Sequence, residues 1–263
     1  MKKFFGSRLS GTVLAWEMLM DISLPEGIRR FCARKNVSCQ EIATGFVLCG
    51  ILSGALLALL CFLLNISWIN RYVAAGIFAV AAAVFCEYKD SGRGLKLLVS
   101  AIFRRSSGEG WVDSALEASA NDRSLEKNMG GLAVLLFWAL QVCCFGLLAY
   151  YRASLWCIVV LAGAFTVQML FATLPRPMGE EPFLKIPSAR RMKIWFLPIA
   201  TAIAAFFFFP AATLVAVVLV GGLGQMIHKD FMITQTPVTA DVITLSGKIT
   251  EIVLLLCGII FVL

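Results

Sequence analysis

Two pairs of carboxylates have a spacing that puts both acids of each pair on one face of a helix. Asp113 and Glu117 are four residues apart, and Asp122 follows them closely. Glu87 and Asp90 are three residues apart. Such acids can hold Mg²⁺ against a diphosphate while neighbouring Lys and Arg side chains neutralise the remaining phosphate charge. The alternative for each pair is a solvated helix face whose carboxylates form local ion pairs.

The composition restricts where such chemistry can take place. Of 263 residues, 60% are apolar and only 15% are charged, whereas a soluble domain carries roughly 25% charged residues. This excludes an ordinary soluble globule and a disordered chain, and it predicts a membrane protein. The net charge of +7 is then explained by basic loops on the cytoplasmic side of a bilayer rather than by a nucleic-acid partner.

The apolar runs supply seven candidate spans, since a span needs about 20 mainly apolar residues. Pro210 lies where a turn would divide the longest run into two spans. The sequence therefore predicts an all-α, polytopic integral membrane protein, a single membrane domain over residues 1–263 with about seven transmembrane helices. The expected spans are 42–64, 68–86, 130–151, 154–174, two within 194–227, and 243–263.

Lys and Arg alternate between rich and poor connections. Residues 1–41 and 87–129 carry seven each, 175–193 carry five and 228–248 carry two, and the other connections carry only Arg71 and Arg152. The positive-inside rule then predicts a multi-pass protein of the cell (plasma) membrane, with its N-terminus in the cytoplasm and its C-terminus outside.

All sixteen carboxylates fall on the same predicted side as the basic connections. We therefore expect the polar chemistry at the cytoplasmic face, although outer loops too short to carry charge would give the same pattern. Residues 1–41 are predicted as an interfacial segment because 11–31 have an amphipathic pattern. Residues 87–129 and 228–248 are predicted as cytoplasmic polar segments, with a second amphipathic stretch at 93–105.

Other function classes find little support. The nine cysteines form no C-x-x-C pair and are interpreted as reduced, mostly apolar thiols. No Walker A, GxSxG, HExxH or GxGxxG motif occurs. A transporter would place charge inside its spans. Here the predicted span interiors hold only Gln141, Gln168 and Gln225 as long polar side chains, with Lys248 and Glu251 near the start of the last span.

Several short motifs then follow one another in a characteristic order. Residues 45–57 read GFVLCGILSGALL, 113–117 read DSALE, 122–125 read DRSL and 172–180 read ATLPRPMGE. Gly224-Gln225 follows, and Asp241 and Glu251 have the spacing of G-D-x-x-G-A-x-x-E-x-x-E. In this order of motifs, over nearly its whole length, the chain resembles the cobalamin synthase family (adenosylcobinamide-GDP ribazoletransferase).

The resemblance implies a Mg²⁺-dependent phosphotransferase of the last steps of cobalamin biosynthesis. Such an enzyme joins adenosylcobinamide-GDP to α-ribazole or its 5′-phosphate and releases GMP. Its partners would be corrinoid and nucleotide small molecules, membrane lipid, and other corrinoid-assembly enzymes or a second copy of the chain, with no nucleic acid. It implies metal or phosphate-site acids at Asp113, Glu117, Asp122, Asp241 and Glu251, with Glu87 and Asp90, and phosphate partners at Arg123, Lys127 and Arg176; no catalytic residue is assigned.

The chain also departs from that family. The family's H-x-D-G-L-A-D-T-x-D-G signature follows the second span, and its three aspartates become Arg93, Leu97 and Ser100 in one register. A second register uses Glu87 and Asp90 instead. Lys248 replaces a glutamate of the final motif. The alternative hypothesis is therefore a catalytically degenerate relative that acts as a binding or scaffold subunit on the same fold.

Overall fold

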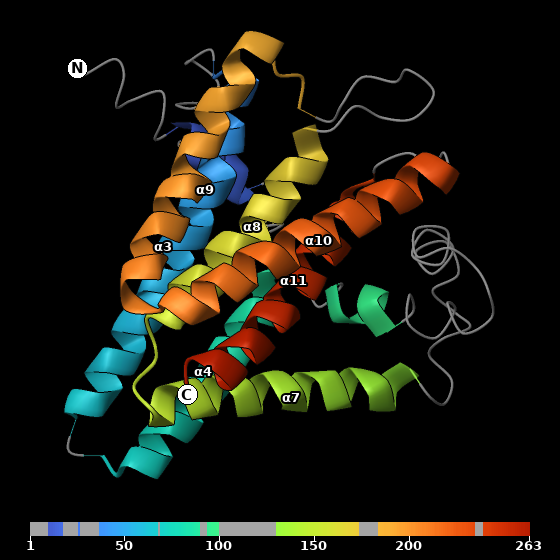
Figure 1. Ribbon diagram of the computed structural model, residues 1–263. Helices are drawn as coiled ribbons and strands as arrows, with labels where there is room; N and C mark the ends of the chain where they lie inside the picture. Colours follow the sequence, from blue (N-terminus) through green and yellow to red (C-terminus); the bar gives the residue numbers. More distant parts are fainter. Residues whose placement is uncertain are drawn as a thin grey trace.

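The computed structural model describes residues 10–17, 26, 37–67, 69–89, 94–99, 130–173, 184–234 and 239–263, and these residues contain helices but no strand. Seven long helices lie at the positions of the seven predicted spans (Figure 1). The all-α prediction is therefore confirmed. The helices are α3 (Cys39–Ile66), α4 (Arg71–Lys89), α7 (Gly130–Tyr150), α8 (Trp156–Thr173), α9 (Ser188–Phe208), α10 (Pro210–Thr234) and α11 (Ala240–Phe261).

Five of these helices, α3, α4, α7, α8 and α11, are long and apolar enough to cross a membrane. The apolar stretches of α9 and α10 are shorter, at Lys193–Phe208 and Pro210–Met226. Pro210 begins α10 directly after the end of α9, so the predicted turn between them is confirmed. The protein is accordingly a multi-pass membrane protein.

Helix α8 lies at the centre of the bundle. It packs against α3 and α11 over long contacts and also touches α9 and α10, while α7 packs against α4 and α11 (Figure 1). The apolar stretches of α8 and α11 are mostly buried within the protein, whereas less than a third of that of α7 is buried. The core is therefore built around α8 and α11, and α11 connects it to the α4–α7 pair.

Small residues let α3 and α8 approach closely. A side chain added at Gly50 would come within 2.7 Å of the carbonyl oxygen of Leu161, and one at Gly54 within 2.5 Å of the Cα of Ile158. Without a hydrophobic drive between helices in lipid, such backbone-to-backbone packing is a main source of association. At its start, α3 is fixed by a capping box in which Ser38 and Glu41 satisfy each other's backbone N–H groups.

Two short helical segments, residues 10–17 and 94–99, pack against the long helices. Residues 10–17 pack against α3, where Gly11 and Gly45 meet and Ala15 is fully buried. This part of the predicted interfacial segment is therefore integrated into the bundle. Residues 94–99 bury Leu95 and Leu98 against the side chains of α11, as the amphipathic pattern of that stretch predicts.

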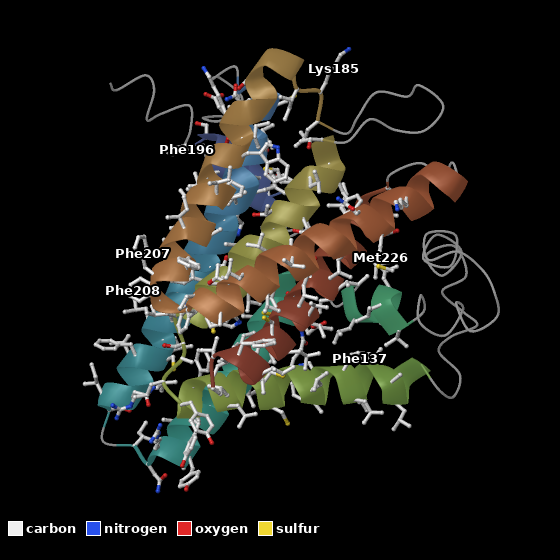
Figure 2. The ribbon with its side chains drawn as sticks, in the orientation of Figure 1. Phe137, Lys185, Phe196, Phe207, Phe208 and Met226 are labelled. Atoms are coloured by element: carbon white, nitrogen blue, oxygen red, sulfur yellow. The ribbon has the colours of Figure 1, made fainter. Side chains whose placement is uncertain are left out.

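The outer face of α9 is lined with phenylalanine. Phe196, Phe207 and Phe208 are exposed and point away from the other helices (Figure 2). In a soluble protein such a surface would drive aggregation, but in a membrane protein it faces lipid. These three phenylalanines therefore face lipid, whereas Phe209 packs against Trp156 in the core.

Candidate functional site

A cluster of polar side chains lies between α4, α7 and α11. The ammonium of Lys248 lies 2.5 Å from Oε1 of Glu87 and 3.1 Å from Oε1 of Glu251. The side-chain amide of Gln141 donates to the same Glu251 oxygen at 2.8 Å. We call these four residues the Lys248 cluster. It joins three helices whose sequences are far apart.

The Lys248 cluster is almost completely enclosed. Lys248 and Glu251 are 0% exposed, Gln141 is 1% exposed, and the side chain of Glu87 is 17% exposed. Charged groups at such a depth are costly unless they pair with one another. Their presence inside an otherwise apolar bundle is therefore the strongest pointer to function among the described residues.

Helix geometry explains how the cluster assembles. Lys248 and Glu251 are three residues apart, so both face the same side of α11. Glu87 lies in the last turn of α4 and Gln141 lies at the middle of α7. Buried leucines of residues 94–99 pack beside the cluster on α11 and help to exclude water, which strengthens the ionic contacts.

A second glutamine approaches the same part of α11. Gly247 makes room for it, because a side chain at Gly247 would come within 2.2 Å of Nε2 of Gln168. Among the described residues, the carbonyl oxygens of Gln141 and Gln168 have no hydrogen-bond partner although both are buried. Buried acceptors of this kind are uncommon. The two glutamines approach α11 at different points, Gln141 at Glu251 and Gln168 at Gly247.

Glu87 and Glu251 do not form a site for a Mg²⁺ ion between them. The ammonium of Lys248 lies against both Glu87 and Glu251, where a cation shared by these two acids would have to sit. Within the described ranges, no group of three or more His, Cys, Asp or Glu residues could hold a metal. The arrangement instead suits a carboxylate that exchanges a proton, because Lys248 holds Glu87 and Glu251 in place and Gln141 also holds Glu251.

The predicted site residues are only partly brought together. Glu87 and Glu251 meet, whereas Asp241 lies in the first turn of α11, about 15 Å along the helix from Glu251. The remaining predicted residues lie outside the described residues: Asp90, Asp113, Glu117, Asp122, Arg123, Lys127 and Arg176.

The sequence analysis missed the depth of Lys248 and Glu251. They do not lie at the start of a span: α11 begins at Ala240, and Glu251 lies at its midpoint. The part of the predicted polar segment 228–248 that follows Asp241 is likewise inside the bundle, where Ser246 and Lys248 are buried. The i, i+3 spacing of two opposite charges within an apolar helix could have indicated that both are buried as a pair.

That correction removes one argument made from the sequence. The sequence predicts span interiors without charge, and for this reason it gives a transporter little support. Lys248 and Glu251 are intramembrane charges by their position in α11. Comparison with known proteins adds no further assignment: the chain matches no protein-family model, no curated protein and no solved structure.

Proposed function

We propose that this chain is a cobalamin-synthase-like membrane phosphotransferase that joins adenosylcobinamide-GDP to α-ribazole, or its 5′-phosphate, with release of GMP. One observation carries the proposal: Lys248 contacts both Glu87, at the end of α4, and Glu251 on α11, so the two acids lie close together. In the family that the chain resembles, the stretch after the second span and the E-x-x-E of the last span carry the acids of the site. The meeting of these two stretches in space supports a shared site.

The proposed reaction assigns a role to each of the three charged members of the Lys248 cluster. The 5′ oxygen of α-ribazole forms a bond to the phosphorus attached to cobinamide, the bond from that phosphorus to the bridging oxygen breaks, and the electron pair leaves with GMP. Glu87 is the partly exposed member of the cluster, so its carboxylate is the candidate acceptor of the hydroxyl proton. Lys248 and Glu251 would act behind it as positioning residues.

Mg²⁺ belongs to the proposal only through acids outside the described residues. When bound, it would neutralise diphosphate charge. Its candidate ligands and the phosphate-binding partners are Asp90, Asp113, Glu117, Asp122, Arg123, Lys127 and Arg176.

The proposed location is the cytoplasmic face of the cell membrane. Basic residues concentrate in the connections that the positive-inside rule assigns to that face. The segment between α4 and α7, which carries most of the candidate acids, starts from the helix end that bears Glu87. A large corrinoid would then bind at the membrane surface, above the Lys248 cluster.

A specific observation also favours a second candidate function. Lys248 stands where the resemblance places a glutamate, and its ammonium contacts the carboxylates of Glu87 and Glu251. A lysine in this position supplies positive charge without a metal. The second candidate is therefore a catalytically degenerate relative that binds corrinoid as a scaffold subunit.

The discriminating experiment measures GMP release. Purified protein in lipid nanodiscs is incubated with adenosylcobinamide-GDP and α-ribazole, with and without Mg²⁺, and corrinoid binding is followed by absorbance. The phosphotransferase predicts GMP release that Glu87→Gln lowers by roughly 10²–10⁴-fold and that the exposed-site control Glu26→Gln leaves unchanged. Corrinoid binding without GMP release favours the scaffold, and absence of both overturns both proposals.

A further inference from the structure

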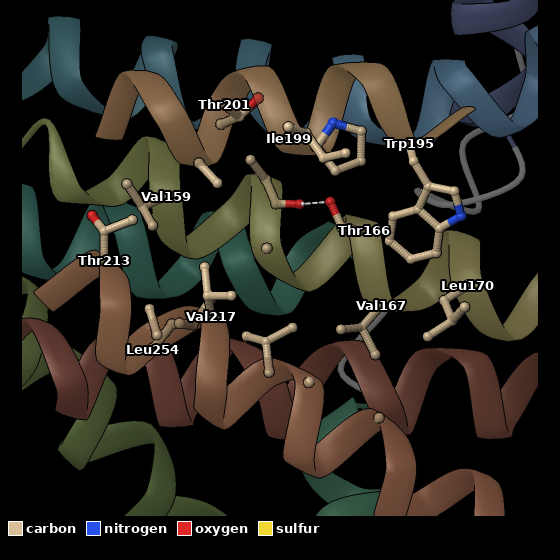
Figure 3. Close-up of a pocket in the computed structure, with 18 of the residues that line it drawn as sticks. Val159, Thr166, Val167, Leu170, Trp195, Ile199, Thr201, Thr213, Val217 and Leu254 are labelled. Atoms are coloured by element: carbon tan, nitrogen blue, oxygen red, sulfur yellow. Dashed lines mark hydrogen bonds between the residues drawn. The ribbon is translucent and has the colours of Figure 1, made fainter. Parts of the chain in front are cut away.

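A second feature of the bundle is an elongated cavity of about 440 Å³ between α8, α9 and α10 (Figure 3). Its volume is in the range of ligand-binding sites in proteins, about 300–1,000 Å³. The lining side chains are almost all apolar, and they include Val159 and Val167 of α8, Ile199 of α9 and Val217 of α10. The cavity is separate from the Lys248 cluster, none of whose members lines it.

The cavity has the length of a hydrocarbon chain. Its lining extends from Val159 to Leu170 on α8 and from Thr213 to Gln225 on α10. These spans correspond to about 16–18 Å of helix. The elongated shape favours a flexible chain over a compact or planar ligand.

The cavity opens towards lipid. α9 and α10 diverge from their shared turn, and α8 forms the floor between them (Figures 1 and 3). Ile199 and Val217 lie on the two sides of this wedge and are each 55% exposed. Because both helices carry exposed apolar side chains along their outer faces, the mouth is reached from within the bilayer.

One end of the cavity carries a hydroxyl group, that of Thr213, that makes no hydrogen bond to a described residue. Thr213 lies in the first turn of α10 and is 4% exposed, and its oxygen has no hydrogen-bond partner among the described residues. By contrast, Thr166 and Thr201, which also line the cavity, donate to backbone carbonyls at 2.7 and 2.9 Å. Thr213 follows directly after the turn between α9 and α10.

We propose that this cavity holds one acyl chain of a membrane phospholipid, which enters sideways between α9 and α10. The ester carbonyl of that chain accepts a hydrogen bond from the hydroxyl of Thr213. The chain then runs along α8 towards Trp195 at the other end of the cavity. The site does not depend on the phosphotransferase proposal, because it shares no residue with the Lys248 cluster.

Two neighbouring glycines provide a matched pair of variants. A side chain added at Gly221 or at Gly222 meets no atom within 4 Å, so both helical positions accept leucine without a backbone clash. Only Gly221 lines the cavity. Gly221→Leu therefore adds a bulky side chain to the cavity wall, and Gly222→Leu makes the same change in composition and helix propensity beside it.

The protein is reconstituted in nanodiscs of phosphatidylcholine that carries a photoreactive diazirine at the end of one acyl chain. Labelling is mapped by mass spectrometry at Val167, which lines the cavity and is 1% exposed. It is normalised to labelling of the lipid-exposed Leu135 on α7. We expect labelling of Val167 in the wild type and in Gly222→Leu, and its loss in Gly221→Leu. Unlabelled Val167 in the wild type, or equal labelling in the two variants, overturns the proposal.

The hydrogen bond to Thr213 is tested with an ether-linked version of the same lipid, which lacks the ester carbonyl. In the wild type, ester lipid should label Val167 about fivefold more than ether lipid, which is the effect of one hydrogen bond. In Thr213→Val this preference should disappear, because the hydroxyl donor is gone. An ester preference that survives in Thr213→Val overturns the assigned carbonyl partner.

Discussion

Lys248 and Glu87 lie 161 positions apart in the chain, yet the lysine ammonium is 2.5 Å from the glutamate carboxylate. The contact joins α11 to the end of α4. Because Lys248 also contacts Glu251, one buried lysine fixes two carboxylates on two helices. The following predictions test what this cluster and the packing around it contribute.

Replacing Lys248 with methionine should destabilise the protein strongly. The substitution keeps most of the side-chain volume but leaves Glu251 and Glu87 without this ammonium, and breaking a buried pair costs about 3–5 kcal/mol. Thermal unfolding in detergent should show a large fall in midpoint. Lys193→Met, at an exposed lysine at the start of α9, should change stability by no more than about 0.5 kcal/mol.

A neutral version of the cluster should recover part of that loss. In the variant Lys248→Met with Glu87→Gln and Glu251→Gln, the four residues of the cluster carry no charge, so the midpoint should rise above that of Lys248→Met alone. If the single and triple variants unfold at the same temperature, the ionic contacts are not the source of the loss.

Gln141→Leu should have a smaller effect on stability. The substitution removes the 2.8 Å hydrogen bond to Glu251, and a hydrogen bond to a charged group contributes about 1.5–3 kcal/mol. The midpoint of thermal unfolding is again the measurement. Gln225→Leu serves as the control, since Gln225 is exposed on α10, and equal shifts in the two variants would argue against a role for the bond.

Gly54→Ala should weaken the contact between α3 and α8, whereas Gly76→Ala should not. The added methyl group at Gly54 would lie 2.5 Å from the Cα of Ile158, and at Gly76 it would meet no atom within 4 Å. Overpacking costs about 1–3 kcal/mol, while alanine in an open helical position gains up to about 1 kcal/mol. Urea- or heat-induced unfolding of the two variants should therefore shift in opposite directions.

The predicted orientation can be tested with epitope tags in membrane vesicles of known sidedness. Tags inserted after residue 106 and after residue 237 should both be accessible from the cytoplasmic side. A tag at residue 152, in the turn between α7 and α8, should be accessible only from the outside. Accessibility of the first two tags from opposite sides would contradict a single polar face.

The positions of the helices were predictable, but the location of the charges was not. Apolar runs of about 20 residues are typical of transmembrane helices. Pro210 predicts a helix break, because proline disrupts the interior of a helix. The sequence predicts Lys248 and Glu251 near the start of a span, because a hydropathy pattern describes one helix at a time. Their burial in α11 depends on Glu87 in α4 and Gln141 in α7, and no local pattern reveals such partners.

The predicted acids show the same difference between local and distant information. Glu87 and Glu251 were both named as candidates, one from local spacing and one from the family resemblance, and the structure brings them together. Asp241 was named for its spacing from Glu251, but ten residues of helix separate the two along the axis of α11. Asp241 and Glu251 therefore belong to one sequence motif but lie at different heights of α11.

The charges of α11 also impose an order on biogenesis. Each charged side chain at the centre of an inserting helix costs about 2.5–3.5 kcal/mol at the translocon, and α11 carries two near its centre, Lys248 and Glu251. α4, with Glu87, is synthesised long before it. We expect α11 to leave the translocon as a partner of helices already in the bilayer rather than as an independent hydrophobic segment. Integration of α11 would then depend on correct prior assembly of the other helices in the membrane.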